Sequence, residues 1–362
     1  MLRYISAFKI PRAVKIWLVT GLIMVFVQVV IGGITRLTGS GLSITRWDIV
    51  TGSIPPLGEA AWQEAFSLYQ QTPQYQKINQ GMSLGDFKFI YFWEYFHRLW
   101  ARLMFVVFMV PFVWFLWRGM FSKRLLPRML VVVGLAGLEG FFGWIMVASG
   151  LIKRPWVNAY NLTLHLTMAL VIFSYLLWTA FTVYQALPVA SEAPRRFRRF
   201  AWGLVGLTFV QLALGAMMSG TKAGLFYPTW PGMQGGFLPA VLLDGNNWRI
   251  AHFLDYDTHP FMPALVQFLH RNTAYLLSGL LVYFLWSIRK AWPNPILHKA
   301  SVATGVVLAT QVTLGILTLV NCQGQIPVTL GVLHQACAVA LLGVLLFVTY
   351  QFSQKSLDNP NN

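Results

Sequence analysis

The chain has 362 residues, of which 56% are hydrophobic and only 10% are charged, and its formal net charge is +16. This composition lies outside the range of soluble globular proteins and indicates an integral membrane protein. It argues against a nucleic-acid partner, because the basic residues are divided among loops between apolar runs and do not form one surface.

Eight apolar runs are long enough to cross a hydrocarbon core of about 30 Å. We expect the spans at 14–33, 96–117, 129–151, 162–183, 202–220, 268–288, 302–320 and 328–352. The sequence has no series of short alternating segments of the kind that forms a membrane β-barrel. The predicted fold class is therefore an all-α integral membrane protein with eight transmembrane helices.

Basic residues gather before the first span and in the loops that follow the second, fourth and sixth spans. They are Lys9, Arg12, Lys15, Arg118, Lys123, Arg124, Arg128, Arg195, Arg196, Arg198, Arg199, Arg289, Lys290 and Lys299. Loops rich in Lys and Arg stay in the cytoplasm, so we expect both termini to be cytoplasmic. The sequence shows no secretory or transit signal, which favours a bacterial inner membrane.

Two long outer segments remain, 34–93 and 221–266. In the first, Trp62, Phe66 and Tyr69 have helical spacing and predict a short interfacial helix. In the second, His252 and His259 are expected to be solvated loop histidines, as is His298 at a cytoplasmic helix start. Cys322 and Cys337 are expected to be small buried hydrophobic residues, and a disulfide would require the outer ends of the last two spans to touch.

The chain contains an internal repeat. With an offset of 183 residues, 27–56 aligns with 210–239 without a gap. The matched positions of the first copy are Val27, Gln28, Gly32, Thr38, Gly41, Leu42, Trp47, Gly52 and Pro56. We therefore expect two halves, 1–190 and 191–362, each a four-helix bundle. An even number of spans in each half gives both the same orientation, so the repeats are related by an axis along the membrane normal.

The odd-numbered spans share a polar-x-x-x-Gly motif. Its four copies are Gln28 with Gly32, Glu139 with Gly143, Gln211 with Gly215, and Gln311 with Gly315. Positions i and i+4 lie on one helical face, where glycine permits close approach of a backbone or a flat ligand. The motif is consistent either with ordinary helix packing or with residues that line a shared cavity.

The even-numbered spans each carry one histidine near the predicted outer end. These are His97, His165, His270 and His334. Histidines on alternate helices of a bundle can ligate the two faces of one haem, whereas a zinc site usually recruits more ligands than each half offers. We predict two bis-histidine haem sites toward the outer face. Arg98 and Arg271 are candidate propionate partners, although Arg98 can instead pair with Glu94 at i,i+4 or extend to the headgroups.

Several stretches resemble the haem A synthase family, which makes haem A from haem O. They are ITRLTGSGLSITRWDIVTGSIPP (34–56), FKFIYFWEYFHRLWARL (87–103), GLEGFFGWIMVASGL (137–151), FLHRNTAYL (268–276) and LHQACAVAL (333–341). The long first loop without a cysteine pair is similar to the branch shared by mitochondria and many proteobacteria. Glu139, where relatives usually have glutamine, and the stretch 227–232 depart from the family pattern.

The resemblance implies eight helices, bis-histidine haem in each half, and oxidation of a methyl group of haem O to a formyl group through hydroxylated intermediates. Haem A then serves cytochrome oxidase. The expected partners are the lipid bilayer, the enzyme that forms haem O, and an external electron-transfer partner, because the chain has no flavin or nicotinamide fingerprint. A homo-oligomer is left open.

The two halves differ in charge. Glu94 and Glu139 in the N-terminal half stand where the C-terminal half has Gln267 and Gln311. Since a carboxylate can relay protons and an amide cannot, we predict that His97 and His165 hold the substrate haem, with Glu94 as the catalytic proton-handling group. His270 and His334 would then hold a resident haem B.

Two other functions remain open at this stage. A quinol-linked, dihaem b-type electron carrier needs the same histidine ligands but no catalytic carboxylate. A transporter would suit the duplicated fold, but it would need an aqueous path through both leaflets.

Overall fold

The computed structural model describes residues 10–46, 51–150, 154–185 and 187–353, and these contain no β-strand beyond an isolated bridge between Met233 and Gly236. The all-α class is thereby confirmed. Lys9 and Trp47, used above for the orientation and the repeat, lie outside the described residues.

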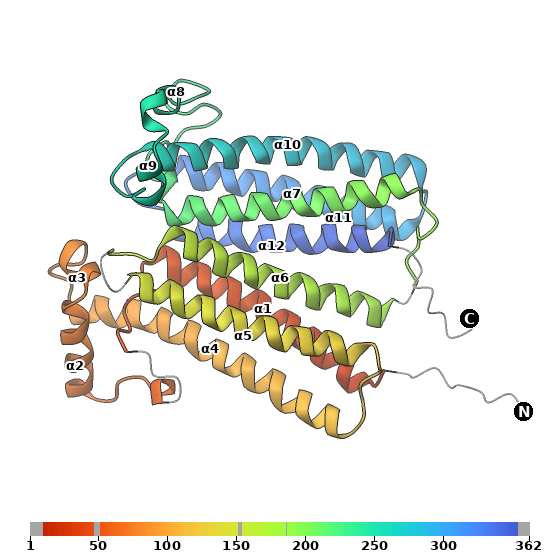
Figure 1. Ribbon diagram of the computed structural model, residues 1–362, viewed down its shortest axis with the longest axis horizontal. Helices are drawn as coiled ribbons and strands as arrows, with labels where there is room; N and C mark the ends of the chain where they lie inside the picture. Colours follow the sequence, from red (N-terminus) through yellow and green to blue (C-terminus); the bar gives the residue numbers. More distant parts are fainter. Residues whose placement is uncertain (1–9, 47–50, 151–153, 186, 354–362) are drawn as a thin grey trace, which may run out of the picture.

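Long helices form the body of the protein (Figure 1). They are α1 (Arg12–Leu37), α4 (Leu84–Trp117), α5 (Leu125–Gly150), α6 (Ala159–Tyr184), α7 (Arg195–Gly220), α10 (Phe261–Ala291), α11 (Pro295–Val320) and α12 (Val328–Gln351). All but α10 are long and apolar enough to cross a membrane, which gives 7 spans within the described ranges. The helix α10 has 31 residues and runs beside α7 and α11, but polar residues such as Gln267 and Asn272 lower its hydropathy. Its role as the eighth span remains a prediction.

The long helices form two groups, and four of them make the boundary between the groups. Within the first group α1 packs against α4 and α6, and α5 packs against α6; within the second, α7 packs against α10 and α12, and α11 against α12. The pairs α1–α12 and α6–α7 join the two groups. The start of α1 and the end of α12 lie at the same end of the bundle (Figure 1).

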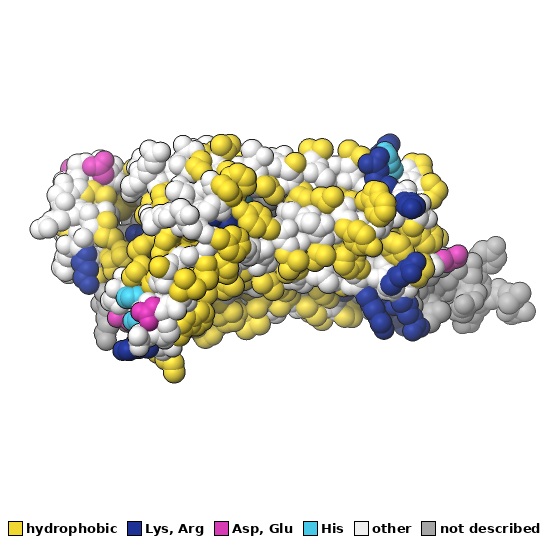
Figure 2. All heavy atoms as spheres, turned by 90° about the horizontal axis from the view of Figure 1, so that it is seen from above, with side chains coloured by type: hydrophobic (Ala, Val, Ile, Leu, Met, Phe, Trp, Pro, Cys, Tyr) yellow, Lys and Arg dark blue, Asp and Glu magenta, His cyan; other side chains and the backbone are white. Residues whose placement is uncertain are grey.

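Side chains of different kinds are segregated along the bundle. A continuous apolar core runs through both groups, with Leu281 and Phe284 of α10 and Leu342 and Leu345 of α12 fully buried in it. On the surface seen in Figure 2, hydrophobic side chains cover the length of the bundle, and Lys and Arg gather near the end where α1 begins. This distribution is that of a multi-pass membrane protein, since apolar surface of this extent requires a lipid environment.

Polar contacts also cross the boundary, and two of them involve α1. Arg36 Nη2 on α1 donates to Ser219 O at the end of α7, at 2.7 Å. Gln335 Nε2 on α12 donates to Val29 O on α1, at 2.8 Å. A Cβ on Gly33 would lie 2.6 Å from Gln335 Oε1, so this glycine is what lets the glutamine reach the α1 backbone.

The first outer segment contains η1 (Thr51–Ser53), α2 (Glu59–Gln70) and α3 (Pro73–Lys77). The predicted helix through Trp62, Phe66 and Tyr69 is confirmed as α2, whose apolar face packs against Phe87 and Ile90 of α4. Burial raises the pKa of Tyr69 to about 12, while a hydrogen bond from Asn79 acts in the opposite direction.

The helix α4 begins well before the expected span at 96. Ser83 and Asp86 form a reciprocal capping box, in which each side chain bonds to the backbone N–H of the other, and Leu84 is the first helical residue. His97 therefore lies thirteen residues after Leu84, deeper in the helix than the predicted position near the outer end. The apolar run alone misses this extension, because the segment before 96 also carries the charged residues that α4 displays at its outer end.

The second outer segment contains η2 (Ala223–Leu225), α8 (Ala240–Leu243), η3 (Gly245–Asn247) and α9 (Ile250–Leu254). It is fastened to the N-terminal half through Asp257, which pairs with Arg154 at 2.8 Å and accepts from Trp156 Nε1 at 2.9 Å. Burial raises the pKa of Tyr256, whose hydroxyl accepts from Ala159 N. The segment thus closes over the boundary between the halves.

The remaining histidines and the cysteines form no cluster with the four span histidines. His252 and His259 stack on each other, with ring centroids 4.1 Å apart, and His298 is exposed at the start of α11. Cys322 and Cys337 are both free thiols. Burial raises the pKa of the Cys322 thiol, which suits its expected role as a small packed residue.

Candidate functional site

Each polar residue of the repeated motif reaches one histidine of the neighbouring even-numbered span. In the N-terminal half, Gln28 Nε2 lies 3.0 Å from His97 Nε2, and Glu139 Oε1 lies 3.1 Å from His165 Nδ1. The second pair is close but lacks the alignment of a hydrogen bond.

The C-terminal half repeats this arrangement. Gln211 Nε2 lies 3.1 Å from His270 Nδ1, and Gln311 Nε2 lies 3.4 Å from His334 Nε2. The motif therefore occurs four times, and in each copy the polar side chain lies against one imidazole.

The glycine of each motif makes room for the same imidazole. A Cβ added to Gly32 would lie 3.2 Å from His97 Nε2, and one added to Gly215 would lie 3.2 Å from His270 Cε1. At Gly143 and Gly315 the Cβ would come within 3.0 and 2.8 Å of the facing ring. Any larger residue at these positions would push the histidine away from its helix, so the glycines form cradles for the rings.

The four polar residues also share an unsatisfied atom. Among the described residues, one buried oxygen of each has no hydrogen-bond partner, namely Gln28 Oε1, Glu139 Oε2, Gln211 Oε1 and Gln311 Oε1. His165 Nδ1 and His334 Nδ1 are also buried without a hydrogen-bond partner. Buried polar atoms without partners cost about 1–3 kcal/mol each, so four repeated cases indicate a group that the protein residues do not supply.

These features fit haem. Each half carries two histidines held in this way, His97 and His165 in the first and His270 and His334 in the second. Haem needs only two axial ligands from the protein, which is the number of span histidines that each half offers. An imidazole that binds iron through one nitrogen presents N–H on the other, for which the unsatisfied amide or carboxylate oxygen is an acceptor.

Glu94 lies three residues before His97 and is buried, with 3% of its surface exposed. Arg98 Nη2 donates to Glu94 Oε1 at 2.6 Å, and Ser43 Oγ and Ile44 N donate to Glu94 Oε2 at 2.7 and 2.8 Å. All three partners are donors, so the surroundings suit a carboxylate. The alternative stated above for Arg98, an ion pair with Glu94, is the contact that this structure contains.

The C-terminal half has a matching anchor built on an amide. Gln267 Nε2 donates to Tyr227 O at 2.7 Å, and Tyr227 is the repeat counterpart of Ile44. Arg271 Nη2 donates to Thr229 O at 2.7 Å, as Arg98 Nη1 donates more weakly to Arg46 O at 3.4 Å. In both halves, the residues around the histidine therefore hold an outer loop. In the first half α4 holds the loop that follows α1, and in the second half α10 holds the loop that follows α7.

Arg271 is fully engaged in this anchor, because it also donates to Pro231 O and Gly232 O. Both arginines thus donate to protein acceptors, and their assignment as propionate partners stays a prediction.

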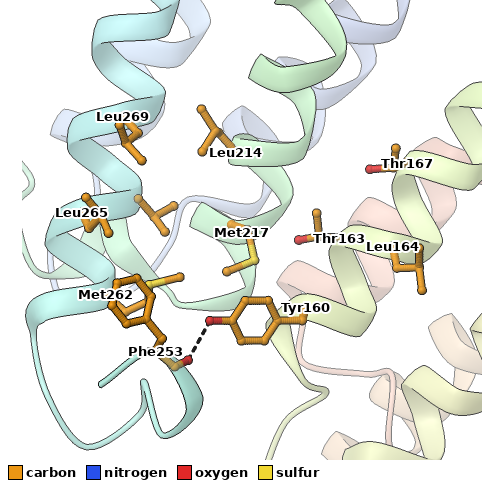
Figure 3. Close-up of a pocket in the computed structure, with 11 residues that line it drawn as sticks. Tyr160, Thr163, Leu164, Thr167, Leu214, Met217, Phe253, Met262, Leu265 and Leu269 are labelled. Carbon is orange, nitrogen blue, oxygen red and sulfur yellow. Dashed lines mark hydrogen bonds between the residues drawn. The ribbon is translucent and has the colours of Figure 1, made fainter. Parts of the chain in front are cut away.

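An apolar cavity of about 510 Å³ lies between the halves, lined by residues of α6, α7, α9 and α10. Figure 3 shows Tyr160 and Thr163 of α6 on one side and Met262 and Leu269 of α10 on the other, with the Tyr160 hydroxyl bonded to Phe253 O. None of the four span histidines lines this cavity, but Leu164 and Leu269 in its wall directly precede His165 and His270.

Together these features define a helical, multi-pass membrane protein that presents a cradled pair of histidines in each of two similar halves. The family model described as cytochrome oxidase assembly protein, COX15-CtaA, matches residues 15–346. Similar relatives include "Heme A synthase" from a Bradyrhizobium species, 42% identical over 91% of this chain and 88% of the relative. The protein of the same name from Flavobacterium psychrophilum is 38% identical over 96% of this chain and 100% of its own length. The chain belongs to the haem A synthase family.

Sequence reasoning missed several residues that shape the site. Ser43 donates a hydrogen bond to Glu94. Gln335, next to His334, joins α12 to α1 through a hydrogen bond for which Gly33 leaves room. The glutamine follows a predicted ligand directly, and a polar residue at that depth in a span was a signal that could have identified it.

Proposed function

We propose that this chain is a haem A synthase, which oxidises a methyl group of haem O to a formyl group. The observation that carries the proposal is the fourfold cradle, in which a polar-x-x-x-Gly motif sets each of His97, His165, His270 and His334. The family membership of the chain supports the same reaction.

The overall conversion is R–CH3 + H2O → R–CHO + 4 H+ + 4 e−, written with water as the formal source of oxygen. It proceeds in two two-electron steps through the alcohol, and an external membrane electron-transfer partner takes up the electrons. A resident haem B supplies one-electron transfer when bound. The residues of the chain bind and orient the two haems and handle the protons.

We assign the substrate haem to His97 and His165, and haem B to His270 and His334. The assignment rests on the charges of the two sites, since Glu94 and Glu139 belong to the first and Gln267 and Gln311 to the second. Oxidation of a methyl group releases protons, and only the first site offers carboxylates to accept them.

Glu94 is the carboxylate we assign to proton handling. It is buried beside His97, and the Ser43 hydroxyl bonded to its Oε2 provides a first link toward the outer loop. Its second role is to anchor that loop. Gln267 shows that an amide at this position still holds the loop, so Glu94→Gln separates the two roles.

The experiment is expression of the chain in cells that make haem O, followed by extraction and chromatography of the haems. The wild-type chain is expected to yield haem A. Finding only haem B and haem O, with haem O supply verified, would instead favour the dihaem b-type electron carrier. Glu94→Gln is expected to keep the haem B spectrum while haem O or a hydroxylated intermediate accumulates, and a normal haem A yield would remove Glu94 from the mechanism.

We further propose that the protein lies in the bacterial inner membrane with both termini in the cytoplasm and the haem sites toward the outer face. The gathering of Lys and Arg at the end where α1 begins supports this orientation (Figure 2). Haem O would arrive from the enzyme that forms it.

A further inference from the structure

The four cradles are alike in geometry but not in charge. Three of the histidines face a neutral glutamine amide, and His165 alone faces a carboxylate, with Glu139 Oε1 at 3.1 Å from its Nδ1. The repeat counterpart of this pair is Gln311 with His334, at 3.4 Å. The two pairs differ in the polar side chain, which is a carboxylate in one and an amide in the other, and in the ring nitrogen that this side chain approaches.

The carboxylate changes how strongly the histidine can donate electrons to a metal. A carboxylate that accepts the N–H of a ligating imidazole increases the electron donation of the opposite nitrogen, and it fixes the ring orientation. Electron donation by an axial ligand stabilises ferric over ferrous iron and lowers the reduction potential of a haem. A neutral amide has a much weaker effect, because it carries no net charge.

The surroundings of Glu139 leave it available for this task. Both side chains of the pair are largely enclosed, with 19% and 21% of their surfaces exposed. Glu139 Oε2 has no hydrogen-bond partner within the described ranges, and His165 is the one cation-forming group that the structure pairs with this carboxylate. The glycine one turn further along, Gly143, would place a Cβ 3.0 Å from His165 Cε1, so the ring is pressed onto the helix that carries the carboxylate.

We propose that Glu139 is a positioning residue that makes His165 the strongest electron donor of the four histidines, so that the haem in the N-terminal half has the lower potential of the two. The inference rests on the proposed function, because it requires haem at both histidine pairs. It goes further by assigning a role to Glu139 and a direction to the difference between the sites. A low potential at the substrate haem favours the flow of electrons from it to the haem in the C-terminal half.

The test exchanges the two residues. Glu139→Gln gives the N-terminal pair the amide of its counterpart, and Gln311→Glu gives the C-terminal pair the carboxylate. The N-terminal pair is studied in the full-length chain with His270→Ala and His334→Ala, reconstituted with haem B as the probe. The C-terminal pair is studied through the resident haem of the otherwise unchanged protein. Each haem is titrated potentiometrically, and its low-spin ferric signal is recorded by electron paramagnetic resonance.

Glu139→Gln is expected to raise the potential of the N-terminal haem, with a change of about tenfold in the ferric-to-ferrous ratio, or about 59 mV for one electron. Gln311→Glu is expected to lower that of the C-terminal haem by a similar factor. Both substitutions should also shift the ferric g values, which a purely structural role would leave in place. Gly140→Ala, on the same helix with open space around it, is the matched control and should change neither quantity.

Unchanged potentials in both variants, or shifts of the opposite sign, would overturn the inference. Failure of the reconstituted N-terminal pair to take up haem B would also overturn it, because the inference requires haem at both histidine pairs. Failure of the proposed function is recognised separately, since it appears as the absence of haem A from wild-type cells supplied with haem O.

Discussion

The glycine cradles allow a prediction in which stability and haem binding change in opposite directions. Gly315→Ala places a Cβ 2.8 Å from His334 Cε1. Carbon atoms pack at about 3.5–4.0 Å, so the imidazole must move by about 0.7 Å or more. Functional geometry tolerates about 0.5 Å, and the displaced ring therefore no longer meets the iron correctly.

The magnitude follows from two opposed effects. Overpacking costs about 1–3 kcal/mol, which at 1.4 kcal/mol per factor of ten is about a 5- to 150-fold loss of haem affinity. Without haem, the ring is free to turn away, and alanine stabilises a helix by about 0.5–1 kcal/mol relative to glycine. We therefore expect weaker haem binding in a protein whose haem-free form is as stable as the wild type or more so.

The assay titrates haem into haem-depleted protein and follows the absorbance difference, with thermal unfolding of the haem-free form measured in parallel. Gly305→Ala is the control on the same helix, because nothing lies within 4 Å of its Cβ position. Gly32→Ala should have a smaller effect, since the nearest atom of His97 is 3.2 Å away. Wild-type haem affinity in Gly315→Ala would refute the cradle as an element of the binding site.

Three further predictions concern the outer end. Arg271→Lys replaces a planar fork that reaches three carbonyls with a single ammonium, and faster proteolysis within 227–232 at unchanged helix content is expected. Tyr69 has a raised folded-state pKa of about 12, so its contribution to stability is complete below pH 10 and is lost as the pH rises toward 12. Tyr69→Phe should flatten this alkaline loss, as followed by tryptophan fluorescence, and an unchanged pH profile would exclude Tyr69 as its source. Asp257→Asn removes the partner of Arg154 and should lower the midpoint of thermal unfolding by a few degrees at low salt, with a smaller difference at high salt.

The sequence predicted the helices well because they depend on local pattern, and it singled out the four span histidines on the same basis. Apolar length marks the spans, and ionisable residues within them are conspicuous. It also identified the polar-x-x-x-Gly motif, whose two residues lie on one helical face. What it left open was the partner of the motif, because pairing Gln28 with His97 depends on how α1 and α4 are aligned along their lengths.

The uses of the arginines were harder to predict. Arg98 and Arg271 were candidates for binding an anion, but in the structure they donate to loop carbonyls and, for Arg98, to Glu94. A guanidinium has five donors, and nothing in the adjacent sequence tells which acceptors a distant loop will bring to it. The early start of α4 is different, since the capping box of Ser83 and Asp86 is a local signal that an apolar-run search does not weigh.

The bond between Arg36 and Ser219 bears on how such a chain could arise. The two residues are 183 positions apart, the same offset that aligns the repeats, so they are counterparts of each other. In a symmetric dimer of identical four-helix units, the residue at this place would meet its own copy across the axis. Two arginines there would confront each other in an apolar setting, whereas two small hydroxyl residues would not. The arginine thus suits a single fused polypeptide, in which the two copies of a once-shared position were free to become different.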